Sequence, residues 1–533
     1  MAGVRSAIAI VVDPDVSDVG IDHVALVGDL RRLGIGRPIV VPGLARHPEL
    51  LTGAVKSAGV RRAVVVSAEL GHPPLSELRM WGEAAGLAPL GVNVVALDIL
   101  RAQRSTAERS AYSLRMVRAA VAALVAPANG LAVRRPVGAS LSRRALLNGR
   151  ATTWVPVVEV QARTCLGTQA CGRCVQACPA DALQIQDDLD GASPVVDVSR
   201  CEACSGCLDV CPTGALSLDG HDPGAIAQTL RALLSRSDGL APPSLVIACR
   251  SAVQPLHDLG ERSGLPGWLV MEVACLGGVG SAWHLAALAA GAPSVQLLPC
   301  ERCMDRGFLT KELAFTRKLL QALGDVDASR RVGILPPGGR SLKRAVQAAG
   351  GLRALVAESD ADPMPMPAPD GLGTSARAAA WAVGEIARAL TGPVRDQDPR
   401  PQATLGEGAP LGILRATQGC TACGVCARSC PTSALSLTAE PGGTALVLDP
   451  AACTGCAVCV QTCPESVLEV VRGVDLELLG LGRSAIALVA VAACPDCGEN
   501  VPALPATAHR SSMPADLAQR CPRCRQAALA ASV

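Results

Sequence analysis

The stretch CTACGVCARSCP, residues 420–431, places three cysteines two residues apart and a fourth cysteine directly before a proline. A second such stretch, CTGCAVCVQTCP, covers residues 453–464. Three thiolates at this spacing can wrap one loop around three irons of a [4Fe-4S] cubane, while the fourth reaches a neighbouring cluster. The two stretches together predict one module that holds two cubanes, with a helix beginning at each proline.

The same module recurs 252 residues upstream, where seven of eight cysteine positions coincide with those of the second copy. This internal repeat predicts two ferredoxin-like 2[4Fe-4S] modules, at 161–220 and 411–472. Zinc is the alternative metal, but zinc sites rarely use cysteine triplets. The predicted ligands are Cys165, Cys171, Cys174 and Cys211 for cluster one; Cys178, Cys201, Cys204 and Cys207 for cluster two; Cys420, Cys423, Cys426 and Cys463 for cluster three; and Cys430, Cys453, Cys456 and Cys459 for cluster four.

One cysteine of the first module is displaced. In CLGTQACGRCVQACP (165–179), Thr168 occupies the position of Cys420, and Cys165 lies three residues upstream. Three residues span at most ~10 Å, so a looped segment can return the Cys165 sulfur to the cluster, and we expect Cys165 to be a ligand. The alternative is a three-iron cluster, or a threonine or water ligand, with Cys165 idle.

Composition excludes several functions. The 49 basic and 47 acidic residues of this 533-residue chain are interspersed, and aromatic residues make up only 2%. No basic surface or stacking platform for nucleic acid is therefore expected. The most apolar stretch, 273–298, contains several glycines and prolines and predicts a helix and a buried strand, with no membrane span. The start of the chain has no secretory pattern, so we expect a cytoplasmic protein in which 24 cysteines bind metals.

The remaining chain predicts a multidomain α/β and α+β protein. Apolar runs alternate with amphipathic helical stretches in 1–130 and again in 240–357, which indicates two α/β domains with parallel sheets. Residues 131–160 are interpreted as a linker. Residues 358–410 are interpreted as a second, Pro/Gly-rich linker that contains one helix, ARAAAWAVGEIARAL.

Three strands of the second α/β domain end in cysteine. SLVIAC, WLVMEVAC and SVQLLPC end at Cys249, Cys275 and Cys300, and Cys303 follows. The carboxyl ends of parallel strands converge on one edge of a sheet, so four thiols can hold one metal centre there. We favour a [2Fe-2S] cluster; zinc, a redox dithiol and buried structural cysteines are the alternatives. His257 and His284 are interpreted as core residues.

The last four cysteines form two pairs, in CPDCG and CPRC, within residues 485–530. This spacing predicts a zinc ribbon-like tail with one structural zinc, bound by Cys494, Cys497, Cys521 and Cys524. A rubredoxin-like iron at the same cysteines is one alternative. His509, which lies between the pairs, is another candidate ligand.

The second α/β domain resembles the delta subunit of methyl-viologen-reducing hydrogenase, an iron–sulfur electron carrier that docks on heterodisulfide reductase. The resemblance rests on LVIAC (245–249), EVACLGGVG (272–280), AGAPSVQLLPCERC (290–303), LLQALG (319–324) and RRVGILPPGG (330–339). The chain departs from that family where it has Cys249 alone, with Ala252 three residues later, in place of a cysteine pair. It also has Cys300 and Cys303 where the family has a wider pair.

The first α/β domain is similar to the amino-terminal domain of the heterodisulfide reductase A subunit, on residues 59–89 and 93–124. In that family the strand equivalent to VVVSA tends to end in cysteine, whereas Ser67 and Ala68 stand here, so no cluster is expected in this domain. The family also carries a flavin domain. The glycine-rich stretches near 480 and at 333–341 lack the required spacing and are interpreted as turns, so the chain resembles a flavin-free relative.

These features predict an electron-carrying subunit with no catalytic residues of its own. Four cubanes would relay single electrons between a flavin- or metal-bearing oxidoreductase subunit and an acceptor such as a soluble ferredoxin. Two alternatives remain. One is an iron–sulfur and zinc regulatory or assembly protein, and the other is a thiol/disulfide oxidoreductase that uses the Cys249, Cys275, Cys300 and Cys303 site.

Overall fold

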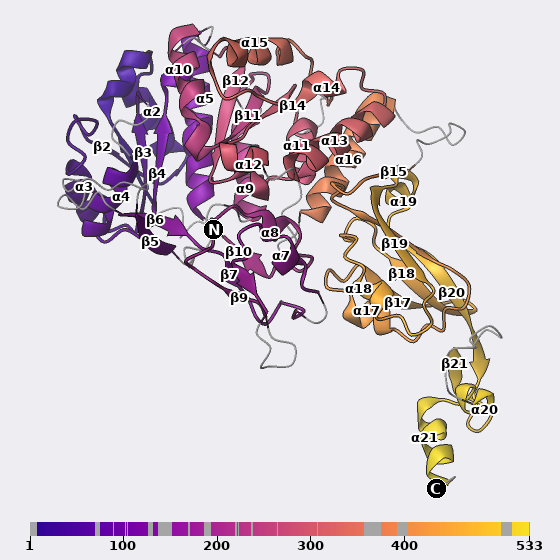
Figure 1. The fold of residues 1–533 in the computed structure, drawn as a ribbon. Coiled ribbons are helices and arrows are strands. Elements are labelled where there is room, and N and C mark those ends of the chain that lie inside the picture. Colours follow the sequence, from indigo (N-terminus) through magenta and orange to yellow (C-terminus); the bar gives the residue numbers. More distant parts are fainter. Residues whose placement is uncertain are drawn as a thin grey trace.

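The computed structural model describes most of the chain (Figure 1). The described residues are 8–69, 75–88, 90–101, 103, 105–125, 132–136, 152–168, 171–185, 193–218, 221, 223–235, 238–263, 265–305, 308–356, 375–391, 403–502 and 514–531. The Pro/Gly-rich segments expected on both sides of the linker helix fall mostly outside these residues, as does His509.

The amino-terminal unit is a parallel four-stranded sheet of order β2-β1-β3-β4 with helices on both faces. Successive residues of β1 face two different cores: Ile8 and Ile10 join one, and Ala9 and Val11 the other. Burial on both faces explains the unbroken apolar run IAIVV. The elements are β1 (Ile8–Val12), η1 (Pro14–Val19), α2 (His23–Arg32), β2 (Arg37–Val40), α3 (Leu50–Ala58), β3 (Arg62–Ser67), α4 (Leu75–Ala84), β4 (Val92–Ala96), η2 (Asp98–Leu100) and α5 (Thr106–Val125).

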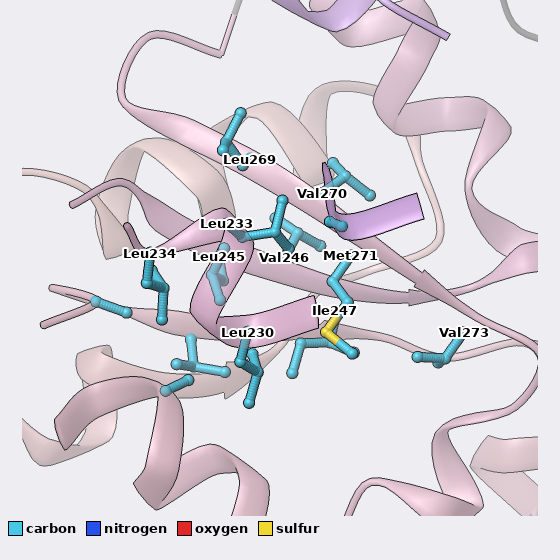
Figure 2. Packing of buried hydrophobic residues seen from close by; sticks show 14 of the residues in the cluster. Leu230, Leu233, Leu234, Leu245, Val246, Ile247, Leu269, Val270, Met271 and Val273 are labelled. Atoms are coloured by element: carbon cyan, nitrogen blue, oxygen red, sulfur yellow. The ribbon is translucent and has the colours of Figure 1, made fainter. Parts of the chain in front are cut away.

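A second parallel sheet, of order β12-β11-β13-β14, follows the first cysteine-rich segment. Leu230 and Leu233 of α9, with the adjoining Leu234, pack beside Leu245 and Ile247 of β11 (Figure 2). The elements are α9 (Pro223–Leu233), β11 (Ser244–Cys249), η3 (Arg250–Ala252), α10 (Gln254–Ser263), β12 (Trp268–Val273), η4 (Leu276–Gly278), α11 (Ser281–Ala289), β13 (Val295–Leu298), α12 (Glu301–Asp305), α13 (Phe308–Ala322), α14 (Ala328–Arg331), β14 (Val332–Ile334) and α15 (Gly339–Ala349). Two parallel sheets, as the sequence predicted, are confirmed.

The two α/β units share one hydrophobic core. Helices α5 and α9 pack on each other between the sheets. Arg115 of α5 is fully buried and donates from its Nε to Asp238 Oδ2 at 2.7 Å, while its Nη2 donates to the other carboxylate oxygen. His257 of α10 lies 2.5 Å from Asp98 of the first unit. The two units, from β1 to α5 and from α9 to α15, therefore pack as one body, which is called the frame below.

The first cysteine-rich module, residues 157–218, lies below this frame in Figure 1 and is built from short elements. Strands β7 and β10 pair antiparallel, as do β8 and β9. In the described part of this module, no helix begins at either proline, although one was expected there. Instead, α7 and α8 precede the fourth cysteine of each run. A turn and a short strand follow each proline, which has no N–H to donate. The elements are β7 (Glu159–Val160), α7 (Arg173–Gln176), β8 (Leu183–Gln184), β9 (Val195–Val196), α8 (Gly206–Asp209) and β10 (Leu216–Ser217); β5 (Ala132–Pro136) and β6 (Thr152–Pro156) pair just before them.

The second module lies at the right of Figure 1 and has longer strands than the first. Strand β19 pairs with β15 and β16, and the hairpin β17-β18 is extended by β20 and β21 towards the tail. The elements are β15 (Thr404–Leu405), β16 (Gly412–Ala416), α17 (Val425–Ser429), β17 (Leu435–Glu440), β18 (Gly443–Leu448), α18 (Val458–Gln461), β19 (Leu468–Val474), α19 (Leu476–Leu481), β20 (Ser484–Ala493), β21 (Asn500–Pro502), α20 (Ala515–Ala518) and α21 (Pro522–Ala531).

Helix α16 (Ala376–Thr391), the helix in the expected linker, packs against α11 of the frame. The apolar stretch 273–298 forms η4, α11 and β13, which confirms the predicted helix and buried strand. Among the described residues, no helix is both long and apolar enough to span a bilayer.

Candidate metal centres

The displaced cysteine of the first module lies beside the other thiols predicted for cluster one. Cys165, Cys171, Cys174 and Cys211 line a single pocket. Burial, together with the neighbouring thiols of Cys211, Cys165 and Cys171, raises the pKa of Cys174 to about 11. Thr168 lines the same cavity, so the threonine alternative is also within reach of the site. The backbone N–H of Gly167 donates to Cys165 Sγ at 3.4 Å and holds the looped segment inward.

The cysteines predicted for clusters two and three gather in the same way. One pocket is lined by Cys178, Cys201, Cys204 and Cys207. Another is lined by Cys420, Cys423, Cys426 and Cys463. Each of the three pockets is lined by four cysteines, the donor set that a [4Fe-4S] cubane requires. The residues present therefore fit this group.

For cluster four, the neighbours of Cys459 identify the set. Burial, together with the thiols of Cys453, Cys456 and Cys430, raises the pKa of the Cys459 thiol to about 12. These three neighbours are the remaining predicted ligands. Cys426 also acts on Cys459, so the cysteine sets predicted for clusters three and four are adjacent.

The ligand loops repeat one backbone conformation. The residue after the second cysteine of each run is left-handed: Gly172, Ser205, Gly424 and Ala457 have φ of 60°, 60°, 74° and 65°. Each begins the short helix that carries the third cysteine. A non-glycine residue in this region costs on the order of 1 kcal/mol or more. Ser205 and Ala457 adopt the left-handed conformation despite that cost. We infer that the positions of the sulfur atoms impose this loop geometry.

Backbone N–H groups point at the sulfurs in both modules. Ala182 donates to Cys178 Sγ, and Ala434 donates to Cys430 Sγ, each at 3.2 Å. Cys178 and Cys430 occupy equivalent positions of the repeat. Hydrogen bonds to cluster sulfurs raise reduction potential, so both modules tune this corner in the same way.

The four cysteines at the carboxyl edge of the second sheet meet around Cys303. Its Sγ lies 3.5 Å from that of Cys249, 3.2 Å from that of Cys275 and 3.6 Å from that of Cys300. Cys249, Cys300 and Cys303 are close enough together to hold one metal ion. Hydrogen bonds from the thiols of Cys275 and Cys303 lower the pKa of Cys249. The convergence expected from three strand ends is therefore present.

This edge touches the loop of cluster two. His221 Nε2 lies 2.9 Å from the carbonyl oxygen of Cys275 and 3.3 Å from its backbone nitrogen. A protonated Nε2 donates to the carbonyl, and an unprotonated Nε2 accepts from the N–H. A Cβ on Gly278 would stand 2.9 Å from the Cβ of Ser205, which separates Cys204 from the third cysteine of its run. Only glycine permits this approach between the two sites.

The histidines near this edge are core residues, as the sequence indicated. Although burial alone would lower the pKa of His257, hydrogen bonds to Asp98 and Glu272 raise it to about 9. His284 is fully buried, and burial lowers its pKa to about 4, so the ring is neutral. Neither ring belongs to the cysteine groups that can hold a metal among the described residues.

The four tail cysteines form a separate group. The sulfurs of Cys494, Cys497, Cys521 and Cys524 all lie within 4.8 Å of one another. Cys521 donates its N–H to Cys494 Sγ, and Cys524 donates its N–H to Cys521 Sγ. Four thiols at this spacing fit one tetrahedral ion, whether zinc or iron. This cysteine group can therefore bind a metal.

A charged crevice where both modules meet the frame was not predicted. Asp209 and Glu312 place carboxylate oxygens 2.9 and 3.2 Å from the point where a Cβ on Gly280 would stand. Burial, together with the charge of Asp209, raises the pKa of Glu312 to about 8. Arg173 and Arg472 line the same crevice. No spacing rule links these positions, because they come from three distant parts of the chain.

Comparison with known proteins identifies the two modules. Residues 164–215 and 419–467 each match the 4Fe-4S dicluster domain family. A search of curated proteins gave no significant match to the chain. Together with the cysteine spacing, the two matches show that the chain carries two ferredoxin-type 4Fe-4S dicluster domains, and they support a role in electron transfer.

Proposed function

We propose that this chain, with its two dicluster domains, is an iron–sulfur electron-transfer subunit of a heterodisulfide-reductase-like or hydrogenase-like oxidoreductase complex. Four [4Fe-4S] clusters relay single electrons, and each is held by one of the four cysteine sets. The iron–sulfur cubanes supply reversible one-electron chemistry when bound. The protein residues hold the clusters, tune them through N–H donors and exclude water from their buried sides.

The observation that carries this proposal is the grouping of the sulfurs. Three of the predicted sets, including the one with the displaced Cys165, each line a single pocket. A cubane needs four thiols at one place, and thiols scattered over the chain could not hold one. Of the sixteen cysteines in these sets, Cys423 alone is exposed. Cluster three is accordingly the point where a partner protein exchanges electrons.

We assign a fifth centre, a [2Fe-2S] cluster, to Cys249, Cys275, Cys300 and Cys303, and a structural zinc to the tail. The fifth centre adjoins the loop of cluster two through Gly278 and His221. The resemblance to the hydrogenase delta subunit makes a metal-bearing hydrogenase, or a flavin-bearing subunit, the partner on this side. A soluble ferredoxin is the candidate partner at cluster three.

The test is anaerobic reconstitution of the full chain followed by metal analysis and redox titration. About sixteen iron atoms in cubanes, reduced reversibly near the roughly −400 mV typical of ferredoxins, are expected. The proposal fails if zinc fills the sixteen positions and acid-labile sulfide is near zero. Clusters that bind but never change redox state would favour the regulatory or assembly alternative.

A second candidate function rests on the lowered pKa of Cys249 next to the Cys275 and Cys303 thiols. A thiolate beside two thiols can exchange with a disulfide substrate, which is reduced to two thiols while two of the protein's cysteines form a disulfide. The near-complete burial of Cys249 and Cys303 opposes this function. Turnover of a small disulfide by the isolated chain, lost in Cys249→Ser, would support it.

A further inference from the structure

The two dicluster modules meet directly. One cavity beneath the frame is lined by Arg173 and Cys211 of the first module and by Thr454 and Arg472 of the second. Cys211 belongs to the ligand set of cluster one, and Thr454 lies between two ligands of cluster four. These two ligand loops therefore face the same cavity, although more than 240 residues separate them in sequence.

The lining of this cavity places predicted clusters one and four on the two sides of the junction. Pro212, which follows Cys211, also lines it. In each module the fourth cysteine of one run belongs to the cluster of the other run, so the two predicted clusters of a module are neighbours. The predicted spatial order is therefore two, one, four, three.

A glycine-rich strap, residues 404–411, fixes the second module to the frame. A Cβ on Gly408 would stand 2.5 Å from the carbonyl oxygen of Lys311, and one on Gly406 would stand 3.0 Å from Phe315. Ser281 Oγ donates to the Gly408 carbonyl at 2.6 Å, and Lys318 Nζ donates to that of Leu405 at 3.1 Å. The strap lies on α13 so closely that glycine is required.

Arg472 joins the strap, the cluster-four loop and the first module. Its Nε donates to the Ala409 carbonyl of the strap at 2.9 Å. Its Cγ lies 3.3 Å from where a Cβ on Gly455, in the cluster-four loop, would stand. Across the crevice, its guanidinium interacts electrostatically with Asp209 of the first module and Glu312 of the frame. The Arg472 side chain therefore contacts the strap and the cluster-four loop, and its positive charge faces the carboxylates of Asp209 and Glu312.

We propose that electrons cross between the modules through clusters one and four, and that the strap and Arg472 position the second module for this step. The cysteine sets on the two sides of the junction would hold the two clusters, and the transfer of one electron between them would form and break no bond. Arg472 is a positioning residue. This inference rests on the proposed function, because it requires that both clusters are present.

The experiment uses the full chain, reconstituted anaerobically and reduced with dithionite, and measures spin–spin coupling between clusters by pulsed EPR. The parent chain is expected to show coupling within each module and coupling across the junction. Gly408→Ala forces the new Cβ into the Lys311 carbonyl and should abolish only the coupling across the junction. Its matched control is Gly384→Ala in α16, whose Cβ would come no closer than 3.9 Å to any other group.

Arg472→Gln tests the junction without altering the backbone, and Arg415→Gln, an exposed arginine of the same module, is its control. Loss of the cross-junction coupling in both test variants, with iron content unchanged, supports the inference. A parent chain that holds its full iron but shows coupling only within modules overturns it. Absence of iron from the parent chain would overturn the proposed function instead. If Gly408→Ala loses iron, the cross-junction coupling measured in Arg472→Gln alone tests the inference.

Discussion

The two dicluster modules share a ligand pattern but differ in how the molecule surrounds them. The first is joined to the frame through His221 and Ser205, and none of its cluster cysteines is exposed. The second is attached through its strap and leaves Cys423 exposed. The first module also has the displaced Cys165, whereas the second keeps the regular run. The same ligand pattern thus has one exposed cysteine in the second copy and none in the first.

The difference teaches that exposure, not ligand type, distinguishes the two copies. Reduction potential and reactivity of a cluster depend on solvent access and on hydrogen bonds to its sulfurs. Cys178 and Cys430 accept equivalent backbone N–H hydrogen bonds, so the contribution of these hydrogen bonds to the reduction potential is the same in both modules. What remains different is the exposure of one ligand, because Cys423 is exposed whereas no cluster cysteine of the first module is.

The largest effect is expected where the copies differ in sequence. Cys165→Ser should remove one ligand of cluster one and convert it to a three-iron cluster, with a new EPR signal in the oxidised chain. Adding Thr168→Cys, which recreates the regular run of the second module, should restore the four-iron cluster. Cys420→Ser is the matched change in the second copy. An unchanged spectrum in Cys165→Ser would show that Cys165 is idle.

The next effect concerns the order in which the clusters decay. Because Cys423 is exposed, brief exposure to oxygen should damage cluster three before clusters one and two. Alkylation of released thiols, read by mass spectrometry, should then label Cys423 and Cys463 before Cys171 and Cys174. Equal labelling of both modules would mean that burial does not protect the first copy.

A smaller effect tests the frame that carries the first module. The pKa of His257 is raised to about 9 in the folded chain, above its ordinary value. Its contribution to stability is therefore complete below about pH 6.5 and is lost as the pH rises through about 9. The loss should reach at most about 3 kcal/mol. His257→Asn should flatten the dependence of the unfolding midpoint on pH between these values, and a variant that keeps the parent's slope would assign it to another group.

The smallest effect on electron transfer is expected from the tail. Cys521→Ser should release the tail metal, measured by metal analysis, without changing the iron content or the EPR signals of either module. The Cys494 group follows β20 along the chain but forms its own small core with Val501. If the tail metal is iron and its loss changes the redox titration, the tail extends the relay.

The local sequence determined the parts of this protein that depend on short spacing. Cysteine runs predicted the dicluster modules, alternating apolar runs predicted two parallel sheets, and three strand ends predicted a common cysteine site at one sheet edge. Each of these follows from geometry within a few residues or from the shared direction of parallel strands. The looped segment from Cys165 to Thr168 could likewise be anticipated, because its reach is limited by chain length.

Only the tertiary structure decided how these parts are arranged. The helices beside the ligand runs precede the prolines because the third and fourth cysteines must point to different clusters. Arg472, Asp209 and Glu312 come together from a strand and two helices in three units, and Gly408 is required only because α13 passes beneath it. Such contacts depend on the packing of distant segments, which leaves no periodic or spacing signal in the chain. That packing placed Cys211 of the first module and Thr454 of the second on one cavity.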